Sequence, residues 1–433
     1  MLVQNYLSGE TSVNIARSVE EAVSAGKLPA GAQLPVVRSL ARHLGVSPAT
    51  VMAAYRLLQD RGVIVAEGRR GTRVRSAPPI AMPADAPLPE GVRDLATGNP
   101  DLGLLPRLPA LDFEKRLYGE ELNDPELLAI AREQFRADRV PAEFLSVTSG
   151  ALDGIERVLR EHLRAGDRVA VEDPCFTGVL DLLSALSLVA VPVPVDDEGL
   201  EPKELRRAIR SCDALVVTPR AQNPSGAAHS PRRARELRTV LASHPALLVI
   251  EDDHAGPIAG TPYLTLVDRN RARWAVVRSV SKSLGPDLRV ALLASDAATH
   301  SRVEGRQTLG IRWVSHVLQR MVVALWRDRA TERLLTRAAK TYGTRRQALV
   351  AALQKRGIEA HGASGFNVWI PVSDESAVVQ AMIARGWAVK GGERYRLNVP
   401  PAVRVTTAAL NDAEAFAEDF AEVVAPRRRA SGS

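Results

Sequence analysis

The sequence SVSKSLGPDLR, residues 279–289, places a lysine between two serines directly after an apolar, β-branched stretch, Trp274–Arg278. This stretch predicts a strand, so Lys282 would lie at the carboxyl edge of a sheet, where open α/β folds bind their ligands. A lysine can form a Schiff base when it is positioned and partly desolvated, because its neutral amine is then accessible. The hydroxyls of Ser279 and Ser281, together with Arg289, could supply a phosphate cradle, since arginine pairs bidentately with phosphate. Residues 279–289 therefore predict a ligand site built around Lys282.

On both sides of this segment, helical patterns alternate with short β-branched runs, which predicts a mostly parallel sheet covered by helices. The expected helices include 125–137 and 151–164, and the expected strands include 168–171, 214–218, 247–250 and 274–278. After about Thr331 a long helical pattern is followed by short strands near 365–372 and 394–405. This last part predicts a smaller α+β lobe.

Three other segments place polar groups at the ends of predicted strands. Residues 147–152, VTSGAL, run from a strand into a helix whose first amides could bind phosphate. Residues 251–254, EDDH, bring carboxylates to a second strand end, where one of them could pair with a pyridinium nitrogen. Residues 223–226, NPSG, offer an amide after a third strand. Each segment alone is weak, because such residues are usually caps and solvated turns, so the prediction depends on their combination.

The N-terminal part of the chain has the pattern of a helix-turn-helix. A short helix is expected over 36–44, followed by a turn that contains Gly45 and by a helix from Pro48 to about Asp60. Ser47 is suited to cap the second helix, and proline is common at the first helical position. This order of a short helix, a glycine turn and a capped helix is typical of DNA-binding modules.

A predicted hairpin and a positive charge support the same reading. Two β-branched runs, 63–65 and 72–74, flank the sequence EGRRG at 67–71, which predicts a wing with arginines at its tip. Residues 1–75 hold ten lysines and arginines against five acidic residues, so most of the chain's net charge of +7 lies in this part. Such an asymmetry predicts a polyanionic partner.

Length and composition predict several domains. A chain of 433 residues exceeds one ordinary core, and a proline- and alanine-rich stretch interrupts the periodic patterns. We expect a winged-helix domain at 1–75, a linker at 76–92, a larger domain at 93–426 whose small lobe covers about 331–426, and a basic disordered tail at 427–433.

Cysteine usage and hydropathy predict a cytoplasmic setting. Only Cys175 and Cys212 are present, without metal-ligand spacing, so no metal site is expected. Two cysteines fit a reducing compartment better than a disulfide framework. No apolar run approaches the length of a membrane span, and the N-terminus lacks the order of a signal peptide.

Residues 34–47, LPVVRSLARHLGVS, together with the closing Gly71-Thr72, resemble the GntR-type winged helix. This resemblance implies a double-stranded DNA operator as partner, with the start of the second helix in the major groove and the wing near phosphates or the minor groove. The residues then expected at the DNA are Arg38, Ser47, Thr50, Arg69 and Arg70.

From about Asn99 to Arg404, the segments at the predicted strand ends follow the order found in fold-type-I aminotransferases, which this part of the chain resembles. The resemblance implies pyridoxal 5'-phosphate (PLP) as cofactor, with Lys282 as its Schiff-base lysine and Arg404 as the arginine for a substrate carboxylate. The other residues implied at the cofactor are Gly150, Ala151, Phe176, Asn223, Asp252, His254, Ser279 and Arg289.

The same resemblance implies individual roles for these residues. Asp252 would pair with the pyridine nitrogen, with Asp253 as the alternative. Asn223 would bond the ring oxygen, and Phe176 would stack on the ring. His254 stands where a tyrosine is usual, and this departure bears on transamination rather than on cofactor binding. The phosphate is assigned to Gly150, Ala151, Ser279 and Arg289.

A winged helix followed by an aminotransferase-like domain resembles the MocR subfamily of GntR regulators. This resemblance implies a head-to-tail homodimer and a transcriptional regulator that senses PLP or its adduct with an amine or amino acid, for genes of vitamin B6 or amino-acid metabolism. The alternative is a catalytically active aminotransferase with a vestigial DNA-binding head. The first reading predicts a protein that is not an enzyme, or at most a weak transaminase.

Overall fold

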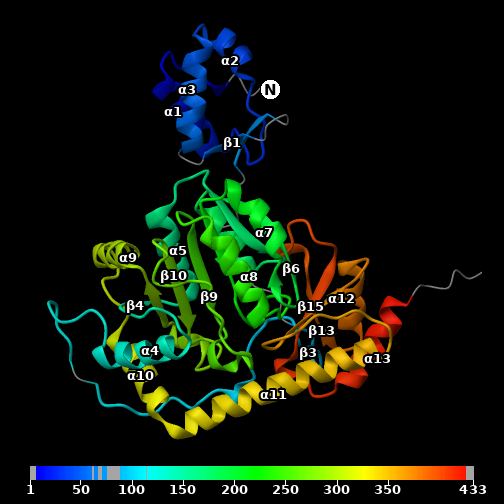
Figure 1. Cartoon of the computed structure of the whole chain (residues 1–433). Helices are drawn as coiled ribbons and strands as arrows, with labels where there is room; N and C mark the ends of the chain where they lie inside the picture. Colours follow the sequence, from blue (N-terminus) through cyan, green and yellow to red (C-terminus); the bar gives the residue numbers. More distant parts are fainter. Residues whose placement is uncertain (1–5, 61–62, 67–70, 76–87, 114, 426–433) are drawn as a thin grey trace, which may run out of the picture. The chain divides into compact units, whose positions relative to one another are not determined.

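The structure is a computed structural model, and it describes residues 6–60, 63–66, 71–75, 88–113 and 115–425. The chain divides into two compact units, each with its own apolar core (Figure 1). Arg69 and Arg70, predicted at the wing tip, lie outside the described residues.

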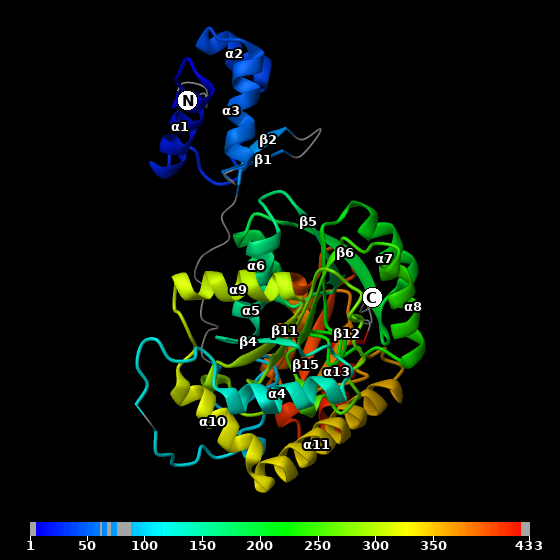
Figure 2. The same ribbon diagram turned by 60° about the vertical axis from the view of Figure 1, so that its left-hand side comes forward.

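The first unit is a winged helix-turn-helix, as expected. Its elements are α1 (Ser12–Ser24), α2 (Val37–Leu44), α3 (Pro48–Asp60), β1 (Ile64–Ala66) and β2 (Thr72–Val74). The two strands pair antiparallel, and β1 contacts α3 (Figure 2). Ile15, Leu40 and Leu58 are fully buried between the helices, and Tyr55 lies in the same core.

The turn between α2 and α3 has the chemistry that the sequence predicts. Gly45 adopts a left-handed conformation with φ of 69°, and its amide donates to the carbonyl of Ala41, which ends α2. The hydroxyl of Ser47 accepts from the amide of Thr50 at 3.1 Å, so Ser47 caps α3 with Pro48 as its first residue.

The second unit is built on an eight-stranded sheet in the order β4-β11-β10-β9-β8-β5-β6-β7. Its strands are β4 (Phe144–Thr148), β5 (Arg168–Asp173), β6 (Val189–Asp196), β7 (Gly199–Leu200), β8 (Ala214–Val217), β9 (Leu248–Asp253), β10 (Trp274–Ser279) and β11 (Ala291–Ser295). Strands β5, β8, β9 and β10 are parallel, whereas β11 runs antiparallel to both of its neighbours, so the sheet is mixed. The prediction of a mostly parallel sheet is right for its centre.

Helices cover this sheet on both sides (Figure 2). They are α4 (Pro125–Ala137), α5 (Ala151–His162), α6 (Thr177–Ala185), α7 (Pro202–Ala208), α8 (Pro231–Ala242), α9 (Ala297–Leu309) and α10 (His316–Arg327). Helix α5 packs on the central strands and against α9, whereas α7 and α8 pack on each other. Among the described residues, no helix is both long and apolar enough to span a membrane.

The small lobe follows the long helix α11 (Arg329–Gln354). Its other elements are β12 (Asn367–Pro371), α12 (Glu375–Ala384), β13 (Trp387–Ala388), β14 (Lys390–Gly391), β15 (Ala402–Thr406) and α13 (Ala413–Val424). Strand β15 lies between β12 and β14, and β13 pairs in parallel with β3 (Arg93–Asp94), which lies far upstream in the chain.

One predicted strand is wrong over its first half. The strand expected near 394–405 begins only at Ala402, because the preceding residues bind elsewhere. The amides of Leu397 and Asn398 donate to the carboxylate of Asp173 at 2.9 and 2.8 Å. Two prolines then follow, and a proline cannot donate to a ladder of hydrogen bonds.

Candidate functional site

The predicted cofactor residues of the second unit lie at the carboxyl ends of its strands. Lys282 follows β10, Asp252 is the last residue but one of β9, and Asn223 follows β8. Gly150 follows β4, and Phe176 follows β5. Because β4, β5, β8, β9 and β10 run in the same direction, these residues meet at one edge of the sheet.

Lys282 is half-buried, and its Nζ donates to the carbonyl oxygen of Gly98 at 2.7 Å. Burial lowers the pKa of this amine to about 8, and the charge of Arg404 adds to the effect. A lysine with this pKa is partly neutral near physiological pH, so its nitrogen can act as a nucleophile.

Asp252 and Asp253 are adjacent in β9, so their side chains point to opposite faces of the sheet. Asp252 is buried, and its Oδ1 has no hydrogen-bond partner among the described residues. Burial, together with the neighbouring charge of Asp253, raises the pKa of Asp252 to about 7. A buried carboxyl group without a partner is the kind of site that a cationic ligand would fill.

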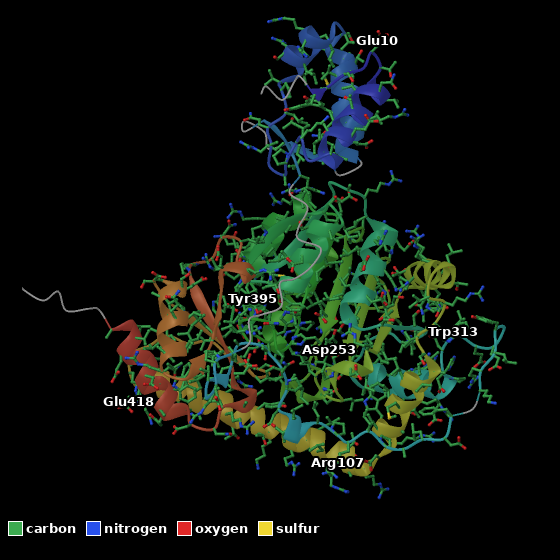
Figure 3. All side chains as sticks on the ribbon, turned by 180° about the vertical axis from the view of Figure 1, so that it is seen from behind. Glu10, Arg107, Asp253, Trp313, Tyr395 and Glu418 are labelled. Carbon is green, nitrogen blue, oxygen red and sulfur yellow. The ribbon has the colours of Figure 1, made fainter. Side chains whose placement is uncertain are left out.

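Asp253, which Figure 3 labels in the interior of the second unit, has cationic partners that Asp252 does not have among the described residues. Arg220 donates to its two oxygens at 2.8 and 2.9 Å, and Arg278 donates to Oδ2 at 2.6 Å. Burial alone would raise the pKa of Asp253, but the two guanidinium charges hold it well below its usual range. Arg278 also bonds Asp138 at 2.5 Å and lies over the ring of Phe135. Asp253 therefore belongs to a charge-neutral cluster of two arginines and two aspartates inside the unit.

Arg404 extends from β15 of the small lobe towards the same sheet edge. Its guanidinium donates to Oδ1 of Asn223 at 3.2 Å and to the carbonyl of Ala96, and it lies over the ring of Tyr395. Since Asn223 accepts with its oxygen, its amide nitrogen is the end that is left to donate to a ligand. The structure thus brings Arg404, Asn223 and Lys282 to one place.

The residues assigned to a phosphate surround the start of α5. Arg289 donates to the carbonyl of Ser149 at 3.1 Å, and Ala151 is the first residue of the helix. Gly150 has φ of 102°, a conformation that favours glycine, and a Cβ there would lie 2.6 Å from a guanidinium nitrogen of Arg289, so this arginine packs closely against the glycine. Ser279 is buried, and its hydroxyl accepts from the amide of Ser281 at 3.1 Å. A helix N-terminus beside an arginine favours an anion.

His254 and Phe176 complete the predicted set. The Nε2 of His254 donates to the carbonyl of Ala221 at 2.8 Å, and burial lowers the pKa of its imidazole to about 4, so the ring is neutral. The ring of Phe176 lies directly over Gly178, where a Cβ would approach it to 2.7 Å.

Sequence reasoning missed several polar residues of this region. Glu172, buried at the end of β5, accepts from the amide of Thr218 and from Gln222 at 3.2 and 3.3 Å, and burial raises its pKa to about 8. The strand-end argument that selected Asp252 applies equally to Glu172. The carbonyl of Gly98 offered no signal, because its contact with Lys282 spans 184 residues of sequence.

In the first unit, the predicted DNA residues with described positions lie near the turn. Arg38 is exposed in the first turn of α2, and Ser47 is exposed before α3. The hydroxyls of Ser47 and Thr50 lie 2.9 Å apart. The start of α3 and the first turn of α2 therefore present polar side chains to the outside of this unit.

Comparison with known proteins identifies the family. Residues 128–416 match the family described as "Aminotransferase class I and II", and residues 11–74 match "Bacterial regulatory proteins, gntR family". The chain is 40% identical over 416 residues to the "Vitamin B6 salvage pathway transcriptional repressor PtsJ" of Salmonella typhimurium, which covers 94% of this chain and 96% of that protein. The chain belongs to the MocR-type GntR regulators. As a MocR-type regulator it is a PLP-responsive, DNA-binding protein of transcription control.

Other proteins show the same relationship. The MocR-type chain is 28% identical over 411 residues to the "HTH-type transcriptional regulator TauR" of Rhodobacter capsulatus, covering 83% of this chain and 82% of that protein. Its second unit resembles the kynurenine aminotransferase of Pyrococcus horikoshii with a TM-score of 0.68 at 19% identity, over 77% of this chain and 90% of that chain. The latter likeness concerns the fold, which is the predicted fold type I.

Pyridoxal phosphate is the cofactor of this MocR-type regulator, and the chemistry of the site fits it. PLP supplies an aldehyde that condenses with an amine with loss of water, a pyridine nitrogen that is protonated beside a carboxylate, and a phosphate. The site offers an amine of lowered pKa in Lys282, an unpaired buried carboxyl oxygen in Asp252, and the glycine–arginine pair Gly150 and Arg289.

The two aspartates of β9 should differ sharply in their effect on stability. In the protein without PLP, we expect Asp253→Asn to lower the free energy of unfolding by at least about 3 kcal/mol, because buried Arg220 loses its carboxylate partner and Arg278 loses one of its two. Asp252→Asn removes a desolvated carboxyl group without a partner, so we expect a change of less than about 1 kcal/mol. Denaturant unfolding at neutral pH measures both, and equal losses would contradict the contrast.

Proposed function

We propose that this regulator senses PLP itself and controls genes of vitamin B6 supply. The observation that carries this proposal is the buried Oδ1 of Asp252, which has no hydrogen-bond partner among the described residues and lies at the sheet edge that also carries Lys282, on a chain that also holds a winged helix. The relative from Salmonella typhimurium, a vitamin B6 salvage repressor, supports this choice of effector. An amino-acid adduct is the second candidate, favoured by the buried Arg404, whose guanidinium could also grip a carboxylate.

Individual roles follow for the residues at the sheet edge. Lys282 bonds covalently to the cofactor, and Asp252 pairs with its pyridine nitrogen, since Asp253 is occupied by Arg220 and Arg278. Asn223 donates to the ring oxygen through its free amide end. Phe176 stacks on the ring, and the phosphate is held by Gly150, Ala151, Ser279 and Arg289.

His254 favours binding over turnover. A tyrosine hydroxyl at this place could donate to the cofactor, but the Nε2–H of His254 already bonds the carbonyl of Ala221. Its neutral ring can then offer only Nδ1, an acceptor, to a neighbouring group. The loss of this hydrogen-bond donor favours a site that binds the cofactor as a signal over one that catalyses transamination.

DNA recognition is assigned to the first unit. The two free cysteines of the chain fit a protein that works in the reducing cytoplasm. Ser47 and Thr50 carry the start of α3 into the major groove, and Arg38 reaches the DNA from α2. Arg69 and Arg70 lie outside the described residues, so their proposed contacts from the wing rest on the sequence alone. The excess of basic residues in 1–75 supports this assignment.

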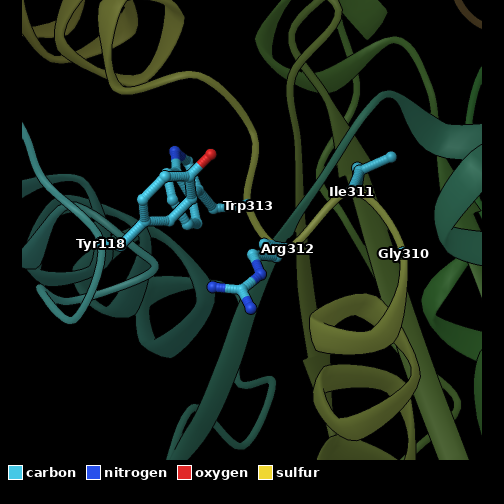
Figure 4. A pocket seen from close by; sticks show the side chains of 5 residues that line it. All are labelled: Tyr118, Gly310, Ile311, Arg312 and Trp313. Atoms are coloured by element: carbon cyan, nitrogen blue, oxygen red, sulfur yellow. The ribbon is translucent and has the colours of Figure 1, made fainter.

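A head-to-tail homodimer is supported by an exposed apolar surface on the second unit. Tyr118, Ile311, Arg312 and Trp313 line a cavity of about 530 Å³ (Figure 4). The rings of Tyr118 and Trp313 meet edge-on at 5.5 Å, and Tyr118 is 79% exposed, as is the nearby Leu309 to 82%. Large apolar groups exposed together mark a protein interface, and we assign this one to a second copy of the chain.

The central test is operator binding by the full chain with and without PLP. A duplex selected from a random library by the wild-type protein serves as probe. We expect PLP to change the affinity of the wild type for this duplex and to produce the visible absorbance of the lysine-bound cofactor. Lys282→Ala should lose both the absorbance and the response while it stays folded. A response that needs an added amino acid would instead select the adduct, and an unchanged spectrum in Lys282→Ala would refute the role of Lys282.

Arg38 should contribute to sequence recognition. We expect Arg38→Ala to cost roughly 1–3 kcal/mol of binding on the selected duplex and little on random DNA, as for a base contact. Arg17→Ala removes the same charge from an exposed position of α1 and serves as the control. Equal losses on both duplexes, with a smaller salt slope, would place Arg38 at a phosphate instead.

The exposed apolar surface should be needed for the dimer. We expect Ile311→Asp to weaken self-association of the full chain at least tenfold, because a charge replaces an apolar contact. Val13→Asp, at a similarly exposed apolar side chain of α1, should leave it unchanged. Sedimentation over a range of concentrations measures both, and a wild type that stays monomeric would exclude the dimer.

A further inference from the structure

The backbone of residues 93–101, which we call the coupling segment, contacts the residues proposed to bind the cofactor. The carbonyl of Gly98 accepts from Nζ of Lys282 at 2.7 Å, and the carbonyl of Ala96 accepts from the guanidinium of Arg404. The two cations assigned to the cofactor and to a ligand carboxylate thus both bind one short stretch of main chain.

Asp94 sets the shape of this stretch. Its Oδ1 accepts from the amides of Ala96 and Thr97 at 2.9 and 3.0 Å, and its Oδ2 accepts from the hydroxyl of Thr97 at 2.6 Å. These bonds close a turn that fixes the direction of the following carbonyls. Gly98 has φ of 73°, and a Cβ there would lie 3.3 Å from a guanidinium nitrogen of Arg404, so the turn lies tightly against this arginine.

Backbone hydrogen bonds tie the first part of the coupling segment to the small lobe. The amide of Arg93 donates to Gly386, and that of Leu95 donates to Ala388, at 2.9 and 3.0 Å. The carbonyl of the buried Leu95 accepts from the amide of Thr406 in the last position of β15. A displacement of Ala96 or Gly98 therefore acts on these strands.

The other end of the segment is bound to α11. The amide of Asp101 donates to the hydroxyl of Tyr342 at 3.1 Å, and Arg345 pairs with its carboxylate at 2.8 Å. Between the two attachments, the carbonyls of Ala96 and Gly98 accept hydrogen bonds from Arg404 and Lys282, the same side chains that we propose to bind a ligand. On its N-terminal side the segment is continuous with residues 76–92, the predicted linker to the winged helix.

We propose that Asp94 is a positioning residue that presents the carbonyls of Ala96 and Gly98 to Arg404 and Lys282, and that the coupling segment relays occupancy of the site to the linker. Lys282 must leave Gly98 when its nitrogen bonds to the cofactor, and Arg404 must weaken its bond to Ala96 when it pairs with a carboxylate. A ligand shifts a conformational equilibrium only through contacts that differ between states, and these two hydrogen bonds are such contacts. The proposal rests on the proposed PLP-sensing function.

The test compares two aspartates with nearly the same bonds. Asp328 caps α11 by accepting from the amides of Ala330 and Thr331 and from the Thr331 hydroxyl, at 3.0, 3.0 and 2.9 Å. In the full chain, Asp94→Ala should bind PLP within threefold of the wild type by visible absorbance. The ratio of affinities for the selected duplex with and without PLP should fall at least fivefold towards one. Asp328→Ala loses an equivalent cap and should keep the wild-type ratio.

Further variants keep the proposal open to refutation. Asp94→Asn retains an oxygen for the two amides and should restore most of the ratio. Thr97→Val removes only the hydroxyl bond and should lower the ratio less than Asp94→Ala does, so it replaces that variant if Asp94→Ala does not fold. A wild type whose DNA binding ignores PLP would refute the proposed function. If the wild type responds to PLP and both Asp94→Ala and Thr97→Val keep its ratio of DNA affinities, the relay is wrong. A loss of PLP affinity beyond tenfold in Asp94→Ala would also overturn it.

Discussion

Two neighbouring carboxyl groups at the end of β9 are buried on opposite faces of one sheet, and among the residues that the structure describes only one of the two has cations beside it. Arg220 and Arg278 neutralise Asp253, while Asp252 keeps an oxygen without a partner. A buried charge is stable only when it is paired, so the fold is complete on one face of β9 and incomplete on the other. We propose that the cofactor binds at the face of Asp252 and supplies the partner that this carboxyl oxygen does not find among the described residues.

Much of this arrangement could be predicted from local sequence. Strand-end positions of Asp252 and Lys282 follow from β-branched runs that stop at polar residues, and the cap at Ser47 follows from turn chemistry alone. The choice between Asp252 and Asp253 could not be predicted, since it depends on Arg220, which follows β8, and on Arg278, which lies in β10. The late start of β15 was also hidden, because its cause is the carboxylate of Asp173, more than two hundred residues upstream.

The contacts that matter most for regulation are of the same long-range kind. Arg404 and Ala96 are separated by 308 positions, and Lys282 and Gly98 by 184. Neither pair has a sequence signature, because a backbone carbonyl can accept from any residue that the fold brings to it. Side-chain motifs therefore identify the cofactor, whereas backbone hydrogen bonds determine which segments of the chain respond to its binding.

The parallel pairing of β3 with β13 bears on how the two units can be separated. A strand of the small lobe is encoded ahead of the whole large sheet, directly after the linker. A gene fission or protease cut directly after Asp94 would remove that strand and expose the backbone edge of β13, and a cut after Leu95 would also take this residue out of the lobe's core. The sensor can therefore be released from its DNA-binding head only by a break before Arg93. In evolution the join between the two modules is correspondingly confined to the linker.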